Sequence, residues 1–162
     1  MYLQLDETFF QELLSQAEKS PRMRSHYTLH KHANESVQRI CVGLKKGTYV
    51  QPHHHQQHNK WELLVVLKGS ITLVLFNNDG VVLKRLELNP SESLNAIEME
   101  PTTWHTVFPV TEDAVFLEVK EGPYTPTANS DFATWAPKEG YADVPIFQKW
   151  LETAQIGEKY TK

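Results

Sequence analysis

Residues 36–120 form a succession of short apolar or alternating runs separated by turn residues, with no helical pattern between them. Eight of these runs are predicted to be strands: SVQRICVGL, TYVQPHHH, WELLVVLKG, SITLVLFNNDG, VVLKRLEL, SLNAIEME, TWHTVFPV and AVFLEVK. Asn78-Asp79-Gly80 predicts a hairpin, because such turns need positive φ angles that Asn and Gly tolerate. Short, evenly spaced strands favour an all-β fold, an antiparallel sandwich or jelly-roll barrel.

Helical patterns lie only outside this region. Within residues 1–20 an amphipathic helix is predicted, with Asp6 or Thr8 as its cap and Pro21 as its stop. Its apolar face contains Phe9, Phe10, Leu13, Leu14 and Ala17. Within residues 141–162 a second helix is predicted to begin at Pro145 and to stop at Gly157. Its apolar face contains Ile146, Phe147, Trp150, Leu151 and Ala154. We expect that face to cover the outside of the barrel, with a dimer contact as the alternative.

The segment 121–140 has several prolines and glycines and no clear period. We expect an ordered arm that lies across the barrel and is anchored by Tyr124, Phe132 and Trp135. The whole chain of 162 residues is then a single domain (residues 1–162), and its 40% hydrophobic content is enough for one core.

The composition and the apolar runs of the sequence indicate which partners and which cellular location to expect. A net charge of -4, with 16 basic and 20 acidic residues interspersed, argues against nucleic acid as a partner. The first ten residues lack the basic and apolar regions of a signal peptide, and no later run is long enough to cross a membrane. A cytoplasmic protein without a membrane partner is therefore predicted. The single cysteine, Cys41, lies in an apolar run and is expected to be a buried structural thiol.

The histidines indicate a candidate functional site, because four of the eight fall between His53 and His58. In a strand, His53 and His55 would point to one face and His54 to the other. Glu62 begins the next apolar run, and the segment PTTWH brings His105 to the start of a later one. A closed barrel can gather these side chains into a mixed nitrogen and oxygen site for a metal. The alternative for PHHHQQH is a solvated loop, which the matching glutamate and the distant histidine disfavour.

The segments GTYVQPHHH and ELLVVLKG together resemble the first motif of the cupins, and PTTWH resembles the second. The resemblance extends to one family. The segments SPRMRSHYTLH, VQRICVGLKKGTYVQPHHH, KWELLVVLKG, LFNNDG, TWHT and LEVKEGPYTP…DFATWAPKEG are similar to the WbuC family of cupin metalloproteins, over about residues 20–140. This resemblance implies a cupin (double-stranded β-helix) barrel with a metal site. Members of that family often accompany surface-polysaccharide genes.

Carried over by motif, the resemblance implies that His53, His55, Glu62 and His105 hold one divalent metal ion, with Zn, Fe, Mn and Ni as candidates. Six residues, QQHNKW, separate the second histidine from Glu62, where the motif has three or four. A longer loop must therefore precede Glu62, which is the least secure of the four ligands. His58, in that loop, is the alternative ligand.

The site needs groups that meet a substrate. Glu118 and Lys120 share one face of their predicted strand, and Arg39 faces away from its apolar neighbours. If these faces look inward, Glu118 can serve as general base, and Arg39 and Lys120 can bind substrate. Ion pairs on the outside of the barrel are the alternative. The segments that resemble the family also contain four residues that could rim the barrel mouth: His30, Tyr124, Arg22 and Arg24. Of these, His30 and Tyr124 are expected to bind substrate, and surface salt bridges are the alternative.

The sequence leaves two functions open. The first is a metal-dependent enzyme, isomerase-, epimerase- or dioxygenase-like, that acts on a small polar substrate. Only the resemblance to the WbuC family, through its surface-polysaccharide genes, implies a carbohydrate-derived one. The second is a metal-dependent module that binds or senses a small molecule without turnover. In either case the expected partners are a small molecule and, by analogy with other cupins, a second copy of the chain.

Overall fold

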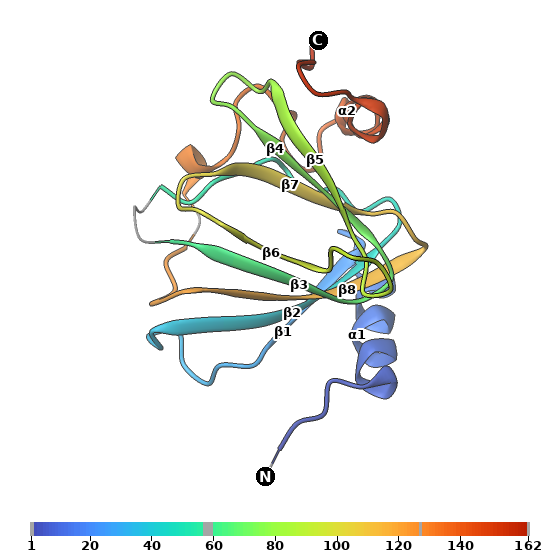
Figure 1. Cartoon of the computed structure of the whole chain (residues 1–162), viewed down its shortest axis with the longest axis vertical. Coiled ribbons are helices and arrows are strands. Elements are labelled where there is room, and N and C mark those ends of the chain that lie inside the picture. Colours follow the sequence, from blue (N-terminus) through green and yellow to red (C-terminus); the bar gives the residue numbers. More distant parts are fainter. Residues whose placement is uncertain (1, 57–59, 127, 162) are drawn as a thin grey trace.

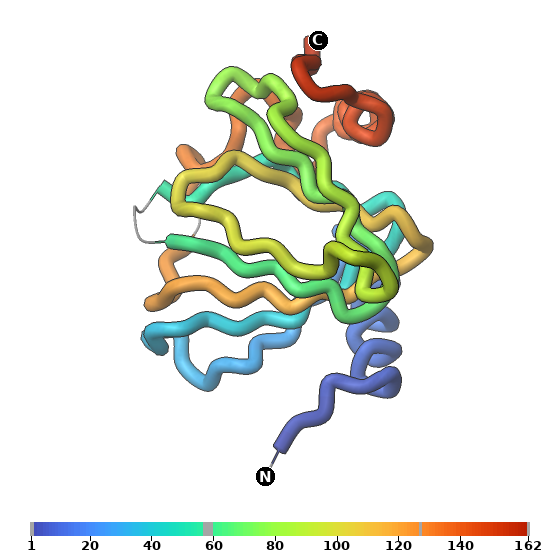
Figure 2. The backbone as a smooth tube through the Cα atoms, in the orientation of Figure 1, coloured from blue at the N-terminus to red at the C-terminus, as the bar shows by residue number. Residues whose placement is uncertain are grey.

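Two antiparallel sheets face each other in the computed structural model, with a helix near each end of the chain (Figure 1). The structure describes residues 2–56, 60–126 and 128–161. The elements are α1 (Glu7–Lys19), β1 (Arg24–Thr28), β2 (Val37–Lys45), β3 (Glu62–Lys68), β4 (Ile71–Phe76), β5 (Val82–Leu88), β6 (Ala96–Met99), β7 (Trp104–Pro109), β8 (Asp113–Glu121), the 3-10 helix η1 (Asn129–Asp131) and α2 (Val144–Thr153). The two ends of the chain lie at opposite ends of the molecule (Figure 2).

The strand order is β1-β2-β8-β3-β6 in the larger sheet and β5-β4-β7 in the smaller one. The main core lies between the sheets and includes Val42, Leu44, Leu64, Val66, Ile71, Leu73, Leu88, Val107 and Phe116. On β2, β3 and β8, the members of this core all have even numbers, as the alternation of side chains in a strand requires. The register continues this inward face to Glu118, which is aligned with Leu64, and to Lys120, which is aligned with Glu62.

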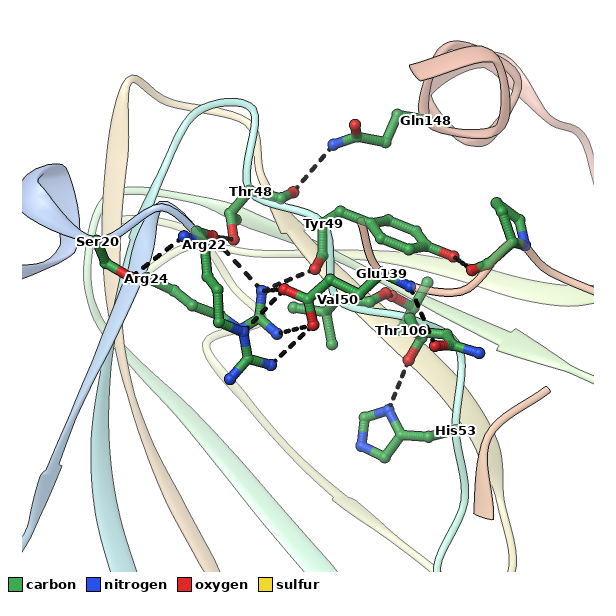
Figure 3. Close-up of polar contacts among 12 residues, drawn as sticks. Ser20, Arg22, Arg24, Thr48, Tyr49, Val50, His53, Thr106, Glu139 and Gln148 are labelled. Carbon is green, nitrogen blue, oxygen red and sulfur yellow. Dashed lines mark hydrogen bonds and ion pairs between the residues drawn. The ribbon is translucent and has the colours of Figure 1, made fainter. Parts of the chain in front are cut away.

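Seven of the eight predicted runs coincide with β2 to β8. The prediction was wrong for TYVQPHHH, where only His53 makes isolated bridges, to His105 and to Phe132. Side chains, rather than a neighbouring strand, bind several carbonyl groups of this segment. Gln148 donates to the carbonyl of Thr48 and Arg24 to that of Tyr49 (Figure 3). Thr106 donates to the carbonyl of Val50. Pro52 has no N–H group to offer to a ladder.

The strand β1 was missed because its sequence, RSHYT, has no apolar alternation. It pairs with β2 along its whole length, from Arg24 opposite Leu44 to Thr28 opposite Ile40. The predicted hairpin is confirmed: β4 and β5 pair, and Gly80 at the turn has a φ of 83°. A Cβ atom at this glycine would lie 2.5 Å from the ring of Trp135, so both the turn and the packing require glycine.

The predicted N-terminal helix is confirmed as α1, and the Asp6 side chain accepts a hydrogen bond from the N–H of Phe9 at its start. Its buried face packs on the outside of the larger sheet against Cys41 and Val115. Cys41 is completely buried, and burial raises its pKa to about 11, so the structural interpretation of this thiol is confirmed.

The C-terminal helix α2 also packs on the barrel itself, as expected. Phe147 and Leu151 are buried beside Val74 and Phe76 of the smaller sheet. Two details differ from the prediction: the helix ends at Thr153, and Ile146 is 65% exposed. Of the helices within the described residues, none is long and apolar enough to cross a membrane.

The arm is partly as predicted. Trp135 packs on Phe76 with their ring centroids 4.8 Å apart, and Phe132 pairs with His53 through its backbone. Tyr124 is 54% exposed, so its assignment as an anchor of the arm was wrong.

Docking of α2 can be tested with two adjacent side chains. Phe147→Ala should destabilise the protein by about 3–5 kcal/mol, because it opens a cavity in a fully buried position. Ile146→Ala, at the exposed neighbour, should change the free energy of unfolding by no more than about 0.5 kcal/mol. Urea unfolding of both variants measures the difference, and equal effects would contradict this packing.

Candidate metal centre and adjoining cavity

The cluster is built on a backbone bridge between His53, in the loop before β3, and His105, near the start of β7. The N–H of His53 donates to the carbonyl of His105 at 3.0 Å, and the reverse bond is 2.9 Å long. This bridge sets the two imidazole centroids 4.4 Å apart. The ring of His55 lies 5.6 Å from that of His53 and 6.4 Å from that of His105. Three imidazoles therefore gather at one place.

Backbone carbonyls fix the orientation of two of these rings. Nδ1 of His53 lies 3.0 Å from the carbonyl oxygen of Gln51, and Nδ1 of His105 lies 2.9 Å from that of Thr103. Because a carbonyl only accepts, each Nδ1 must carry the hydrogen. In the neutral ring Nε2 then bears a lone pair, which is the tautomer that a metal-binding histidine adopts when its other nitrogen is held in this way.

Glu62, the first residue of β3, reaches two of the imidazoles. It is only 4% exposed, and its carboxylate oxygens lie 3.1 Å from Nε2 of His55 and 3.2 Å from Nε2 of His105. An unprotonated Nε2 and a carboxylate oxygen are both acceptors and repel each other, so His105 and Glu62 need a positive charge between them, a proton or a cation. Among the described residues the buried Nε2 of His55 makes no well-aligned hydrogen bond, although the Glu62 oxygen lies 3.1 Å from it. This donor set fits a divalent cation.

Electrostatics keep His53 and Glu62 in the form that binds metal. Burial, together with neighbouring His105, lowers the pKa of His53 to about 3, so the ring is neutral at physiological pH. Burial alone would raise the pKa of Glu62, but His105, His55 and Lys120 hold it below its ordinary value. A neutral imidazole and an ionised carboxylate are the ligating forms.

The cluster is not a preformed cage. Within residues 2–56, 60–126 and 128–161, no group of three or more His, Cys, Asp and Glu side chains is already arranged to hold a metal ion. The close approaches are pairwise, between Glu62 and each of two histidines. The chemical case for a cation therefore comes from the Nε2 atoms of His55 and His105, which face the carboxylate of Glu62, and binding would need side-chain adjustments.

The structure separates the neighbouring histidines as the sequence predicted, although the predicted strand is absent. The ring of His54 turns to Trp104 and stacks on it, with centroids 3.8 Å apart and an interplanar angle of 18°. His58, the alternative ligand, lies outside the described residues.

A cavity of about 430 Å³ adjoins the cluster between the sheets. The three clustered histidines line it with Arg22, Arg24, His26, Gln51, Glu118, Lys120, Tyr124, Phe132 and Glu139, among others. Nζ of Lys120 lies 2.5 Å from Glu118 and 3.6 Å from Glu62, so this lysine joins the cluster to the cavity wall. Burial would lower the pKa of Lys120, but Glu118 and Glu62 raise it above its ordinary value. Glu118, Lys120 and Tyr124 thus lie where the sequence interpretation needed them.

Two proposed substrate-binding residues do not reach this cavity. Arg39 is on the outward face of β2, where it pairs with Glu35 at 3.0 Å. His30 lies beside it, and its Nδ1 accepts from the N–H of Arg39. The sequence showed correctly that Arg39 faces away from Ile40 and Val42, but these apolar residues define the inward face, so the assignment of Arg39 to the lumen was wrong. His30, predicted at the rim of the barrel mouth, does not line this cavity.

The residue that the sequence did not indicate is Glu139, from the arm. Its carboxylate binds both Arg22 and Arg24 on the cavity wall (Figure 3). Arg22 and Arg24 were candidates for the rim, but nothing in the local sequence connects them to a glutamate 115 or more positions away. Only the path of the arm across the barrel brings the three together.

Comparison with known proteins gives the fold and a family. The model of a domain of unknown function (DUF6016) matches residues 5–88. No curated protein matches the sequence. KdgF from Halomonas sp. is 17% identical, with a TM-score of 0.50 over 66% of this chain and 84% of its own. A cupin 2 domain-containing protein from Halorhodospira halophila is 20% identical, with a TM-score of 0.47 over 65% of this chain and 72% of its own.

A chain from the structures of the DMSP lyases RdDddP and RnDddQII is 16% identical, with a TM-score of 0.51 over 65% of this chain and 51% of its own. At these identities the similarity shows the fold alone. The predicted all-β cupin fold with a helix at each end is confirmed.

The tautomer of His53 is directly measurable. In metal-stripped protein at neutral pH, nitrogen-15 NMR should show the hydrogen on Nδ1, because that atom donates to the carbonyl of Gln51. A hydrogen on Nε2 would contradict the orientation of this ring toward the cluster.

Proposed function

We propose that this chain, which belongs to the DUF6016 family, is a metal-dependent cupin enzyme that acts on a small polar substrate in the cavity between its sheets. The observation that carries the proposal is the gathering of three imidazoles and the buried carboxylate of Glu62 beside that cavity. His53, His55, Glu62 and His105 would hold one divalent ion, with Zn, Fe, Mn and Ni as candidates.

When bound, such an ion would polarise a hydroxyl, carboxylate or carbonyl oxygen of the substrate, or support oxygen chemistry if it is Fe(II). An isomerase, an epimerase and a dioxygenase-like enzyme are the classes that this chemistry suits. The resemblance to the WbuC family makes a carbohydrate-derived compound our proposed substrate. A homodimer in the cytoplasm stays the prediction from the sequence.

In this proposal a residue of the chain itself accepts the proton that the substrate loses. The carboxylate of Glu118 faces the cavity, two residues along β8 from Lys120, and it is the proposed general base. Lys120 contacts both Glu118 and Glu62, so it can hold the base in place. The apolar side chains of Val42, Leu64 and Phe116 line the cavity beyond them and limit the access of water.

Metal binding tests the first half of the proposal. Purified protein loaded with Zn, Fe(II), Mn or Ni should retain about one ion per chain, measured by elemental analysis and calorimetry. His55→Ala and His105→Ala should each weaken binding by more than about 100-fold, because each removes a ligand.

His54→Ala is the matched control, because this ring stacks on Trp104 and points away from the cluster. It should retain the ion. If the His54 and His55 variants bind metal equally well, or if the unaltered chain binds none of these ions, the metal site is refuted.

Turnover tests the second half. Metal-loaded protein, incubated with candidate nucleotide sugars and 2-oxo acids, should yield a product, and Glu118→Gln should lower kcat by about 100-fold through loss of the base. Glu98→Gln, at an exposed position of β6, is the control and should keep full activity. Metal binding without turnover on any substrate would instead indicate the binding or sensing module, and full activity in the Glu118 variant would remove its role as base.

A further inference from the structure

Two arginines hold one carboxylate on the wall of the cavity. Nε and Nη2 of Arg22 each lie 2.8 Å from an oxygen of Glu139. Nη1 and Nη2 of Arg24 contact the same two oxygens at 2.9 and 2.8 Å (Figure 3). Each guanidinium thus makes the paired, planar contact that arginine uses to recognise carboxylates and phosphates.

The arginine pair is built into the barrel, whereas the carboxylate comes from the arm. The side chain of Arg24 is only 6% exposed, and its Nη1 also donates to the carbonyl of Tyr49 at 2.8 Å, so it has an anchor besides Glu139. Arg22, with 56% of its side chain exposed, approaches the carboxylate from the solvent side. Burial alone would raise the pKa of Glu139, but the two guanidiniums lower it, so the carboxylate is ionised.

This cluster and the histidine cluster share one cavity. Gln51 connects them, because its side chain accepts from the N–H of Glu139 at 3.4 Å and its carbonyl binds Nδ1 of His53. Without the carboxylate of Glu139, two guanidiniums would face the cavity with no carboxylate from the arm to compensate them. Such a wall attracts an anion.

We propose that Arg22 and Arg24 form an anion-binding subsite of the substrate cavity, that Glu139 occupies it in this structure, and that the substrate carries a carboxylate or phosphate group that takes the place of Glu139. This inference rests on the proposed function, because it names a property of the substrate of the same cavity. The arm then competes with the substrate. A tethered competitor has an effective concentration in the millimolar range or above, so the unaltered chain binds free anions weakly.

Removal of the competitor tests the subsite. Calorimetric titrations of metal-stripped Glu139→Ala with acetate and with inorganic phosphate should show at least about tenfold tighter binding of one of them than in the unaltered chain. Acetate as the tighter ligand assigns a carboxylate to the substrate, and phosphate as the tighter ligand assigns a phosphoryl group. Addition of Arg22→Gln to this variant should abolish the gain.

Glu112→Ala is the matched control, because Glu112 pairs with Lys46 on an exposed surface and should show no gain. If Glu139→Ala does not fold, Glu139→Gln keeps the size of the side chain without its charge and is titrated in the same way. No gain with either anion in a folded variant overturns the subsite and leaves Glu139 as a structural clamp of the arm. Because these titrations use metal-stripped protein, their result is independent of whether the histidine cluster binds metal.

Discussion

The reciprocal backbone hydrogen bonds between His53 and His105 are the contact on which the site depends. They tie an irregular loop to β7 without a continuous strand. They also place each imidazole where a nearby carbonyl can accept from its Nδ1. Since side-chain positions follow the backbone, a shift of this loop would move His53, His55 and the carbonyl of Gln51 together. Main-chain bonds therefore set the relative positions of His53 and His105, and side-chain contacts bring Glu62 to His55 and His105.

Burial of charge explains why the polar residues of the cavity form groups. An isolated ion between two sheets would cost several kcal/mol, so each charged side chain that the structure places there has partners. Glu62 lies among two histidines and Lys120, and Lys120 reaches on to Glu118. On the wall toward the arm, Arg24 is neutralised by Glu139. Interactions of this kind contribute little net stability compared with an apolar core of equal volume, so their presence favours a functional interpretation.

Features that depend on local rules could be predicted from the sequence, whereas features that depend on distant chain segments could not. Alternation gave the strands, and it gave the common face of Glu118 and Lys120, because the same alternation continues from the apolar core into the charged part of β8. It did not give the side-chain bonds to carbonyls that replace a strand at residues 48–55, since the donors come from β1, β7 and α2. The prediction that Arg39 lies in the lumen was wrong for another reason. Alternation separates the two faces of a strand but does not say which face is inside the barrel. That choice is made by the apolar residues of the partner sheet.

A cupin barrel by itself does not define a reaction, because one fold can host many different functions. In this chain an acceptor-rich cluster lies at one part of the cavity and a guanidinium pair at another. In our proposal the first binds a cation and the second an anion, so a substrate that satisfies both would carry an anionic group at some distance from the atoms that react. In this structure the carboxylate of Glu139, from the arm, occupies the guanidinium pair. Selectivity in such a site would come from competition, because only a ligand that outbinds the tethered Glu139 gains both contacts.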